Sequence, residues 1–172
     1  MVTPGRPDID SRIRARLLVA AVTPLLRTVT NASGGAAIAG ATVSDSGGTS
    51  TTTNGAGVYT LPGLTPGTHT VGASATTFKT GTQTASVTAG TTTTVNFSLT
   101  PAPGSVKGSV VSASGGTATS GATVSDSGGA SVTTDASGAY TLSGLTPGSH
   151  SLTAAKTGFS PQSQTASVTA GN

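Results

Sequence analysis

The sequence predicts an all-β protein made of two tandem antiparallel Greek-key β-sandwiches of about seven strands each, the second without its last strand. Three observations support this prediction. The chain repeats itself at an offset of 81 residues, apolar and polar residues alternate within each copy, and motifs rich in Gly and Pro separate the alternating stretches. Alternation with a period of two, interrupted by turn motifs, is typical of short strands that bury one face.

The repeat defines the domain organisation. Residues Arg27–Thr91 align with Gly108–Asn172 without a gap, and 39 of the 65 aligned pairs are identical. A period of this length corresponds to one complete small domain rather than to one turn of a solenoid. We therefore expect a first module at residues 24–100, a stiff linker with two prolines at 101–105, and a second module at 106–172.

The composition excludes several classes of protein. Charged residues make up 8% of the chain and aromatic residues 3%, and there is no cysteine. Without cysteine, no disulfide, thiolate metal site or thiol nucleophile can form. Nucleic-acid binding requires clustered Lys and Arg, usually with stacking aromatic rings, and this chain has neither. We expect no nucleic-acid partner, no cofactor and no membrane span.

Four stretches of the first module show the alternation that predicts strands. Their apolar sets are Ala41 and Val43; Tyr59 and Leu61; His69, Val71 and Ala73; and Val95, Phe97 and Leu99. Polar or small residues stand between the members of each set, which places the members on one face of a strand. These sets are the predicted core of the module.

Turn motifs separate these strands. The Thr-Pro-Gly motif at Thr65–Gly67 predicts a type II turn, because Pro fixes φ at one central position and Gly accepts a positive φ at the next. The Gly-rich motifs at Ser46–Gly48 and Asn54–Gly57 predict hairpin turns.

These strands and turns together resemble a known family. The second copy contains GATVSDSGG, then TTDASGAYTLSGLTPGSHSLTAAKTGF, then QTASVTAG, and this order of motifs is similar to the carboxypeptidase regulatory-like domain, a transthyretin-like (prealbumin-like) β-sandwich. The resemblance covers about residues 27–172. Two departures stand out: His69 and His150 replace the usual Tyr, and Thr77 replaces a Gly that the second copy keeps as Gly158.

The resemblance implies a non-catalytic module of a secreted or cell-surface bacterial protein. Two interpretations of its role remain open. The modules are structural spacers, as part of a longer repeat array, or they form a carbohydrate- or protein-binding accessory module attached to a peptidase, a glycosidase or an outer-membrane receptor. Sugar binding usually uses exposed aromatic rings. The chain has no Trp, and its two Tyr and three Phe are expected on core faces, which favours the spacer.

One constellation invites a catalytic interpretation, and we reject it. Ser44, Asp45 and His69 recur in the second copy as Ser125, Asp126 and His150. Asp45 lies in a turn motif and His69 on a predicted core face, and nothing marks an oxyanion hole or an oriented Ser–His pair. One His and one or two Asp per module are also too few for a metal site. We therefore predict no catalytic, cofactor-binding or metal-binding residues.

The sequence also bears on two covalent modifications. Some adhesins with related sandwiches join a first-strand Lys to a last-strand Asn, but the first module has Leu26 and Arg27 where the Lys is needed. The second module has Lys107 but no matching last strand, so we expect no such isopeptide bond. Asn96 is expected to be an ordinary outward strand residue. Asn31 and Asn96 also match the glycosylation pattern, which arises easily in a chain rich in Ser and Thr.

The two ends of the repeat differ. Residues 1–23 lie outside it and are expected to be a loose tail, although arginines before an apolar run also resemble a signal peptide. Thr91–Thr100, the closing strand of the first module, has no counterpart in the second. The chain is thus expected to be a fragment of a longer array, and the second module to have an unpaired edge open to association.

Overall fold

The computed structural model describes residues 23–172, and the predicted N-terminal tail lies outside this range except for its last residue, Thr23. Every regular element in the described range is a strand. No helix there is long and apolar enough to cross a membrane. The chain forms two compact units, and the prediction of an all-β protein built of antiparallel sandwiches is confirmed.

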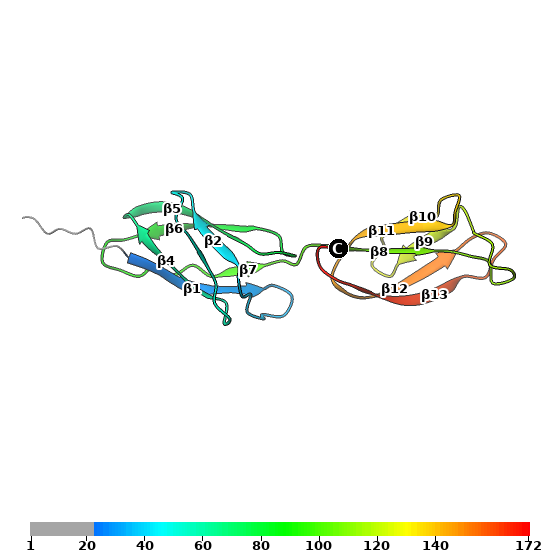
Figure 1. The fold of residues 1–172 in the computed structure, drawn as a ribbon, viewed down its shortest axis with the longest axis horizontal. Coiled ribbons are helices and arrows are strands. Elements are labelled where there is room, and N and C mark those ends of the chain that lie inside the picture. The colour runs from blue at the N-terminus through cyan, green and yellow to red at the C-terminus, as the bar shows by residue number, and fades with distance from the viewer. Residues whose placement is uncertain (1–22) are drawn as a thin grey trace, which may run out of the picture. The chain divides into compact units, whose positions relative to one another are not determined.

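The first sandwich consists of seven strands (Figure 1). They are β1 (Thr23–Asn31), β2 (Thr42–Asp45), β3 (Ser50–Thr52), β4 (Val58–Leu64), β5 (Gly67–Ser74), β6 (Gly81–Val87) and β7 (Phe97–Leu99). One sheet has the order β4-β1-β7 and the other the order β3-β2-β5-β6. The first of these sheets therefore contains β1, β4 and β7. The second contains the sequence-adjacent pairs β2–β3 and β5–β6.

One turn motif is confirmed, one is wrong, and the type II turn at Thr65–Gly67 stays a prediction. The turn Ser46–Gly48 joins the antiparallel pair β2–β3, and Gly48 has φ 92°. Gly67 of the Thr-Pro-Gly motif has φ 143°. The motif Asn54–Gly57 is not a hairpin turn, because it connects β3 to β4, which lie in different sheets. Its tight geometry comes from the Asn54 side chain, whose Oδ1 accepts hydrogen bonds from two backbone N–H groups downstream.

The second sandwich consists of six strands in the described range. They are β8 (Gly104–Ser109), β9 (Thr123–Asp126), β10 (Ser131–Thr133), β11 (Ala139–Leu145), β12 (Gly148–Ala155) and β13 (Gln162–Val168). A four-stranded sheet has the order β10-β9-β12-β13, and β11 pairs with β8 in a two-stranded sheet. The counterpart of β7 is missing from that sheet, as the sequence predicts. Strand β8 already begins at Gly104, inside the predicted linker, and the module boundaries as such stay a prediction.

The predicted core faces of the first sandwich are buried. Ala41, Val43, Val71 and Ala73 are all 0% exposed. The alternation in the sequence therefore identifies the buried face of each strand correctly. A shift of one residue would place every member of a set on the exposed face instead. His69 is the exception in its set, since it lies half-buried at the rim of the sheet.

The core of the second sandwich is more open on one side. Tyr140 is half-buried, whereas its counterpart Tyr59 is 2% exposed. Phe159 was predicted to face a core, and this is wrong because it is 49% exposed. Its counterpart Phe78 is half-buried and forms a β-bridge with Pro101, which follows β7. Phe159 has no such segment above it in the described residues.

Candidate functional site

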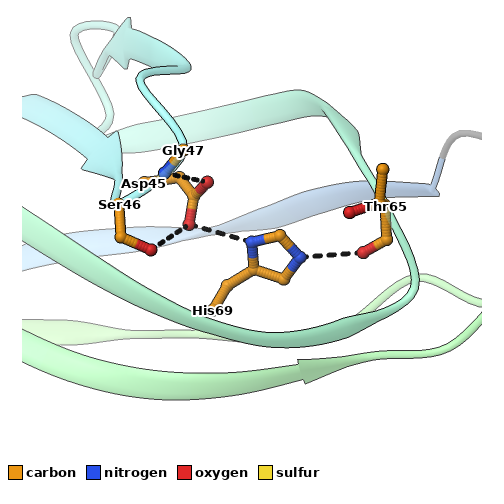
Figure 2. A network of polar contacts seen from close by, with 5 residues as sticks. All are labelled: Asp45, Ser46, Gly47, Thr65 and His69. Atoms are coloured by element: carbon orange, nitrogen blue, oxygen red, sulfur yellow. Dashed lines mark hydrogen bonds and ion pairs between the residues drawn. The ribbon is translucent and has the colours of Figure 1, made fainter.

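Each sandwich contains one Asp–His pair in the same place, which we call a clip. Figure 2 shows the clip of the first sandwich. Asp45 ends β2, and His69 lies near the start of the neighbouring strand β5. Their Nδ1 and Oδ1 atoms are 3.0 Å apart. In the second sandwich His150 and Asp126 are 2.9 Å apart. The carboxylate side chains are 2% exposed and the imidazoles 13% and 12%, so both clips are largely shielded from water.

The second ring nitrogen of each histidine also faces an oxygen. His69 Nε2 lies 2.8 Å from the carbonyl oxygen of Thr65, and His150 Nε2 lies 2.7 Å from that of Thr146. A neutral imidazole carries one N–H and can donate to only one of its two neighbours, whereas the imidazolium donates to both. The geometry therefore favours the charged form of both histidines.

The pKa values shift in the direction that this geometry requires. The hydrogen bond to the Thr65 carbonyl, and then the contact with Asp45, raise the pKa of His69 above its ordinary value. Burial alone would raise the pKa of Asp45. The hydrogen bonds from the Gly47 N–H and from His69 outweigh burial, so the pKa of this carboxyl lies below its ordinary value. The second clip shifts in the same directions.

The carboxylate of each clip also shapes a turn. Asp45 Oδ2 accepts a hydrogen bond from the Gly47 N–H at 2.8 Å, and the Ser46 hydroxyl lies 3.4 Å from Oδ1. A Cβ at Gly47 would lie 2.7 Å from Oδ2, so the residue at this position must be Gly for the carboxylate to approach. The clip thus joins three segments: the β2–β3 turn, strand β5, and the turn that precedes β5.

The clip does not have the arrangement of a nucleophile and its base. Ser44 lies on the exposed side of β2, away from the ring of His69. The hydroxyl nearest the pair belongs to Ser46, and it contacts the carboxylate rather than the imidazole. Both ring nitrogens are already engaged by Asp45 and Thr65. A general base needs a free nitrogen within hydrogen-bond reach of the group that it activates.

The described residues also show no cluster suited to a metal ion. Within residues 23–172 no group of three or more His, Cys, Asp or Glu side chains comes together. The remaining residues considered from the sequence lie apart from the clips. Lys107 is exposed on β8, opposite Thr141. Asn96 is exposed, as predicted, and its Oδ1 accepts from Thr28.

Sequence reasoning missed the Asp–His pairing, although it noticed that both residues recur. The signal that could have found it is the spacing. A strand that ends in Ser-Asp is followed 24 residues later by a His at the start of the neighbouring strand, and both copies keep this spacing. The hydrophobic pattern instead placed His69 with Val71 on the core face, where an aromatic ring would pack.

The family model of the carboxypeptidase regulatory-like domain matches residues 27–100 and again residues 105–172. The chain belongs to this family. No curated protein sequence matches the chain.

Two solved structures are similar to this chain. The Bacillus anthracis TIE protein is 17% identical with a TM-score of 0.50, over 87% of this chain and 32% of that one. A streptococcal ancillary pilin is 16% identical with a TM-score of 0.46, over 86% of this chain and 59% of that one. The chain thus spans about a third and about three fifths of these two proteins. At such identities the likeness concerns the fold alone.

Proposed function

We propose that the two carboxypeptidase regulatory-like domains are non-catalytic structural spacers of a bacterial protein that is secreted or displayed at the cell surface. The observation that carries this proposal is the selective reuse of structural features in the two copies. Buried strand residues, turn motifs and the Asp–His clip recur at the same offset, whereas the exposed positions differ more freely and present small uncharged side chains. A spacer needs a folded body repeated along the chain, and it needs no reactive site.

Fold and surface chemistry agree with this role. The described surface is dominated by Thr, Ser, Ala and Gly, and charged residues are 8% of the chain. A nearly neutral, hydroxyl-rich surface gives no electrostatic steering toward a charged substrate. The Asp–His clips tie turns to strands inside each body, which is a stabilising role.

The proposal is tested by protease shaving of intact cells of the source organism. We expect peptides from residues 27–172 to be released while a cytosolic marker protein stays intact. Release of these peptides only after lysis would contradict an extracellular spacer. The same cells, shaved after mild heating that unfolds the domains, provide a positive control for protease access.

The second interpretation, an accessory module that binds carbohydrate or protein, is favoured by one observation. Phe159 is an exposed aromatic side chain, and it borders a hollow of about 470 Å³ in the second sandwich. A glycan array probed with the chain and with Phe159→Ala separates the two roles. Binding to a defined glycan that the substitution abolishes supports the accessory module, and the spacer predicts no binding by either protein.

A further inference from the structure

The turn between β3 and β4 contains the one Asn-Gly pair of the chain, Asn54–Gly55. An asparagine followed by glycine is chemically labile, because the backbone nitrogen of the glycine can attack the amide carbon of the asparagine side chain, Cγ. Glycine favours this attack since it has no Cβ to obstruct the approach. Whether the reaction runs in the folded protein depends on how the turn holds these two groups.

The attacking group is accessible and unengaged. Both Asn54 and Gly55 are exposed, and a Cβ added at Gly55 would meet nothing within 4 Å. Within residues 23–172 the N–H of Gly55 has no hydrogen-bond partner. The nitrogen can therefore attack without first breaking a contact.

The carbonyl under attack is held by backbone donors. Asn54 Oδ1 accepts hydrogen bonds from the N–H groups of Ala56 and Val58, both at 3.0 Å. Attack at Cγ places negative charge on this oxygen, and backbone N–H groups aimed at a developing oxyanion lower the barrier to its formation. The turn thus provides its own side chain with an arrangement like an oxyanion hole.

These donors are fixed by the sandwich as well as by the turn. Gly57, which lies between them, is buried with φ 70°, and its carbonyl oxygen accepts from the Val29 N–H of β1 at 2.8 Å. The backbone of Asn54 donates to the Val58 carbonyl and accepts from the Gly57 N–H, each at 2.9 Å. Donors that are held in this way need no rearrangement when charge develops on Oδ1.

Asn31 and Asn96 lack this combination. Asn31 is followed by Ala32, whose N–H donates to Leu99 O at 2.9 Å and is therefore engaged. Asn96 is followed by Phe97, a bulky residue that is 2% exposed. Both asparagines are internal controls for the reactivity of the Asn-Gly pair.

The second copy has the product of this reaction in the same turn. Its equivalent pair is Asp135–Ala136. Asp135 Oδ1 accepts from the N–H groups of Ser137 and Ala139 at 2.8 and 2.9 Å, which is the pattern seen at Asn54. The Ser137 hydroxyl, and then the Ala139 N–H, hold the pKa of Asp135 below its ordinary value. The turn is therefore compatible with an aspartate in its charged form.

We propose that Asn54 deamidates spontaneously in the folded protein and that the turn directs the product to aspartate. The Gly55 nitrogen forms a bond to Cγ and loses its proton, the side-chain amide leaves as ammonia, and the resulting ring is a succinimide. One water molecule then opens the ring. In sum, asparagine and water give aspartate and ammonia, with no oxidant or reductant. The inference goes beyond the spacer role and does not depend on it.

The direction of ring opening follows from the donors. Water that attacks Cγ breaks its bond to the Gly55 nitrogen and leaves aspartate in a normal backbone. Water that attacks the backbone carbonyl carbon instead gives isoaspartate, which inserts Cβ into the main chain. Oδ1 has two N–H donors, whereas the backbone carbonyl oxygen of Asn54 has one, from Gly57. Cγ is therefore the more polarised carbon, and opening there gives the hydrogen bonds seen at Asp135.

The test incubates the full chain in neutral buffer made with oxygen-18 water and maps its peptides by mass spectrometry. The reference is a blocked peptide of residues 51–59, TTTNGAGVY, which has the same residues without the sandwich. A protease that cleaves at aspartate but not at isoaspartate distinguishes the two products. We expect oxygen-18 aspartate at position 54, a ratio of aspartate to isoaspartate several-fold higher than in the peptide, and no conversion of Asn31 or Asn96 over the same period.

Variants place the reaction at this turn. Gly55→Ala introduces the residue of the second copy into open space, and should leave most of Asn54 unconverted over the period in which half of the parent chain reacts. The double substitution Asp135→Asn with Ala136→Gly builds the same pair in the second sandwich, where it should convert to aspartate. Asp135→Asn alone is the matched control, because Ala136 still obstructs the attack, and it should react much more slowly.

Several outcomes overturn the proposal. If Asn54 stays an amide in the folded chain while the peptide reacts, the turn protects the site. A product ratio equal to that of the peptide means that the donors do not direct ring opening, and unchanged conversion in Gly55→Ala contradicts the role given to the glycine. Should Gly55→Ala not fold, the double substitution decides: conversion in the second sandwich supports the proposal, and its absence refutes it.

Discussion

The two sandwiches share their turns, their clips and most of their buried positions, but within residues 23–172 only the first has a closing strand. The consequence is visible at Tyr59 and Tyr140, which occupy equivalent positions. The first is 2% exposed with its hydroxyl bound to Val95, and the second is half-buried with no partner in the described residues. A strand of three residues therefore decides whether one side of the core is closed. The same sequence motif therefore packs differently in the two sandwiches as described.

The largest expected effect comes from removing the main core side chain of that strand. Phe97 is 2% exposed, and its ring centroid lies 6.5 Å from that of Tyr59. Phe97→Ala should lower the free energy of unfolding of the first sandwich by about 3–5 kcal/mol, from lost transfer energy and the cavity left behind. Amide exchange, measured separately for β1–β7 and β8–β13, checks this result.

The second sandwich is the internal control for this change. Phe97→Ala should leave the amide protection of the second sandwich unaffected, because the Phe97 ring packs beside Tyr59 in the core of the first sandwich. Ser98→Ala, which changes an exposed position of β7, should alter neither sandwich by more than about 0.5 kcal/mol. Equal loss of protection in both sandwiches would show that they unfold as one cooperative unit, and the comparison would then be invalid.

A smaller effect is expected where the copies differ in backbone chemistry. Thr77 has φ 68°, a left-handed conformation that is unfavourable for a β-branched residue, and the second copy has Gly158 there with φ 85°. Thr77→Gly should stabilise the first sandwich by about 1 kcal/mol, because relieved strain exceeds the added freedom of the unfolded chain. The unfolding midpoint in urea measures the change.

The reciprocal substitution sharpens the same comparison. Gly158→Thr should destabilise the second sandwich by about 1–2 kcal/mol, whereas Gly158→Asn should cost less, because Asn tolerates positive φ better than other residues. A stabilising effect of Gly158→Thr would mean that the backbone at this position does not need a left-handed conformation.

Much of this fold could be predicted from the sequence. The alternation at Val71 and Ala73 reflects burial on one face of a strand, and the repeat reveals the missing closing strand without any structure. The motif Asn54–Gly57 was misassigned because turn chemistry fixes a local bend but not which sheet the next strand joins. Phe159 was misassigned because a hydrophobic side chain marks a core face only when a neighbour covers that face.

The clips could be predicted only in part. Recurrence of Asp45 and His69 draws attention to both residues, but their contact depends on β2 and β5 lying side by side in one sheet. Strand order of this kind is set by long-range packing, which local patterns do not encode. The carbonyl of Thr65, which completes the environment of the imidazole, carries no side-chain signal at all.

The smallest expected effect is a pH dependence common to both sandwiches. Each histidine has a folded-state pKa above its ordinary 6.5, so its stabilisation is fully present below about pH 6.5 and is lost as the pH rises through the raised pKa. Each partner aspartate has a folded-state pKa below 3.8, so its contribution is present above about pH 3.8 and is lost as the pH falls through the lowered pKa. Stability should therefore be greatest between these values.

Single variants test whether the two clips act alike. His69→Gln should flatten the decline above pH 6.5 in β1–β7 while leaving that of β8–β13 unchanged, and His150→Gln should do the reverse. Exchange rates corrected for intrinsic pH dependence, measured from pH 5 to 8, give both profiles in one sample. If stability instead rose with pH across this range, the histidines would be neutral in the folded state. The Thr65 and Thr146 carbonyls would then not be accepting a proton from a charged ring, and the clip would be a packing contact rather than an ion pair.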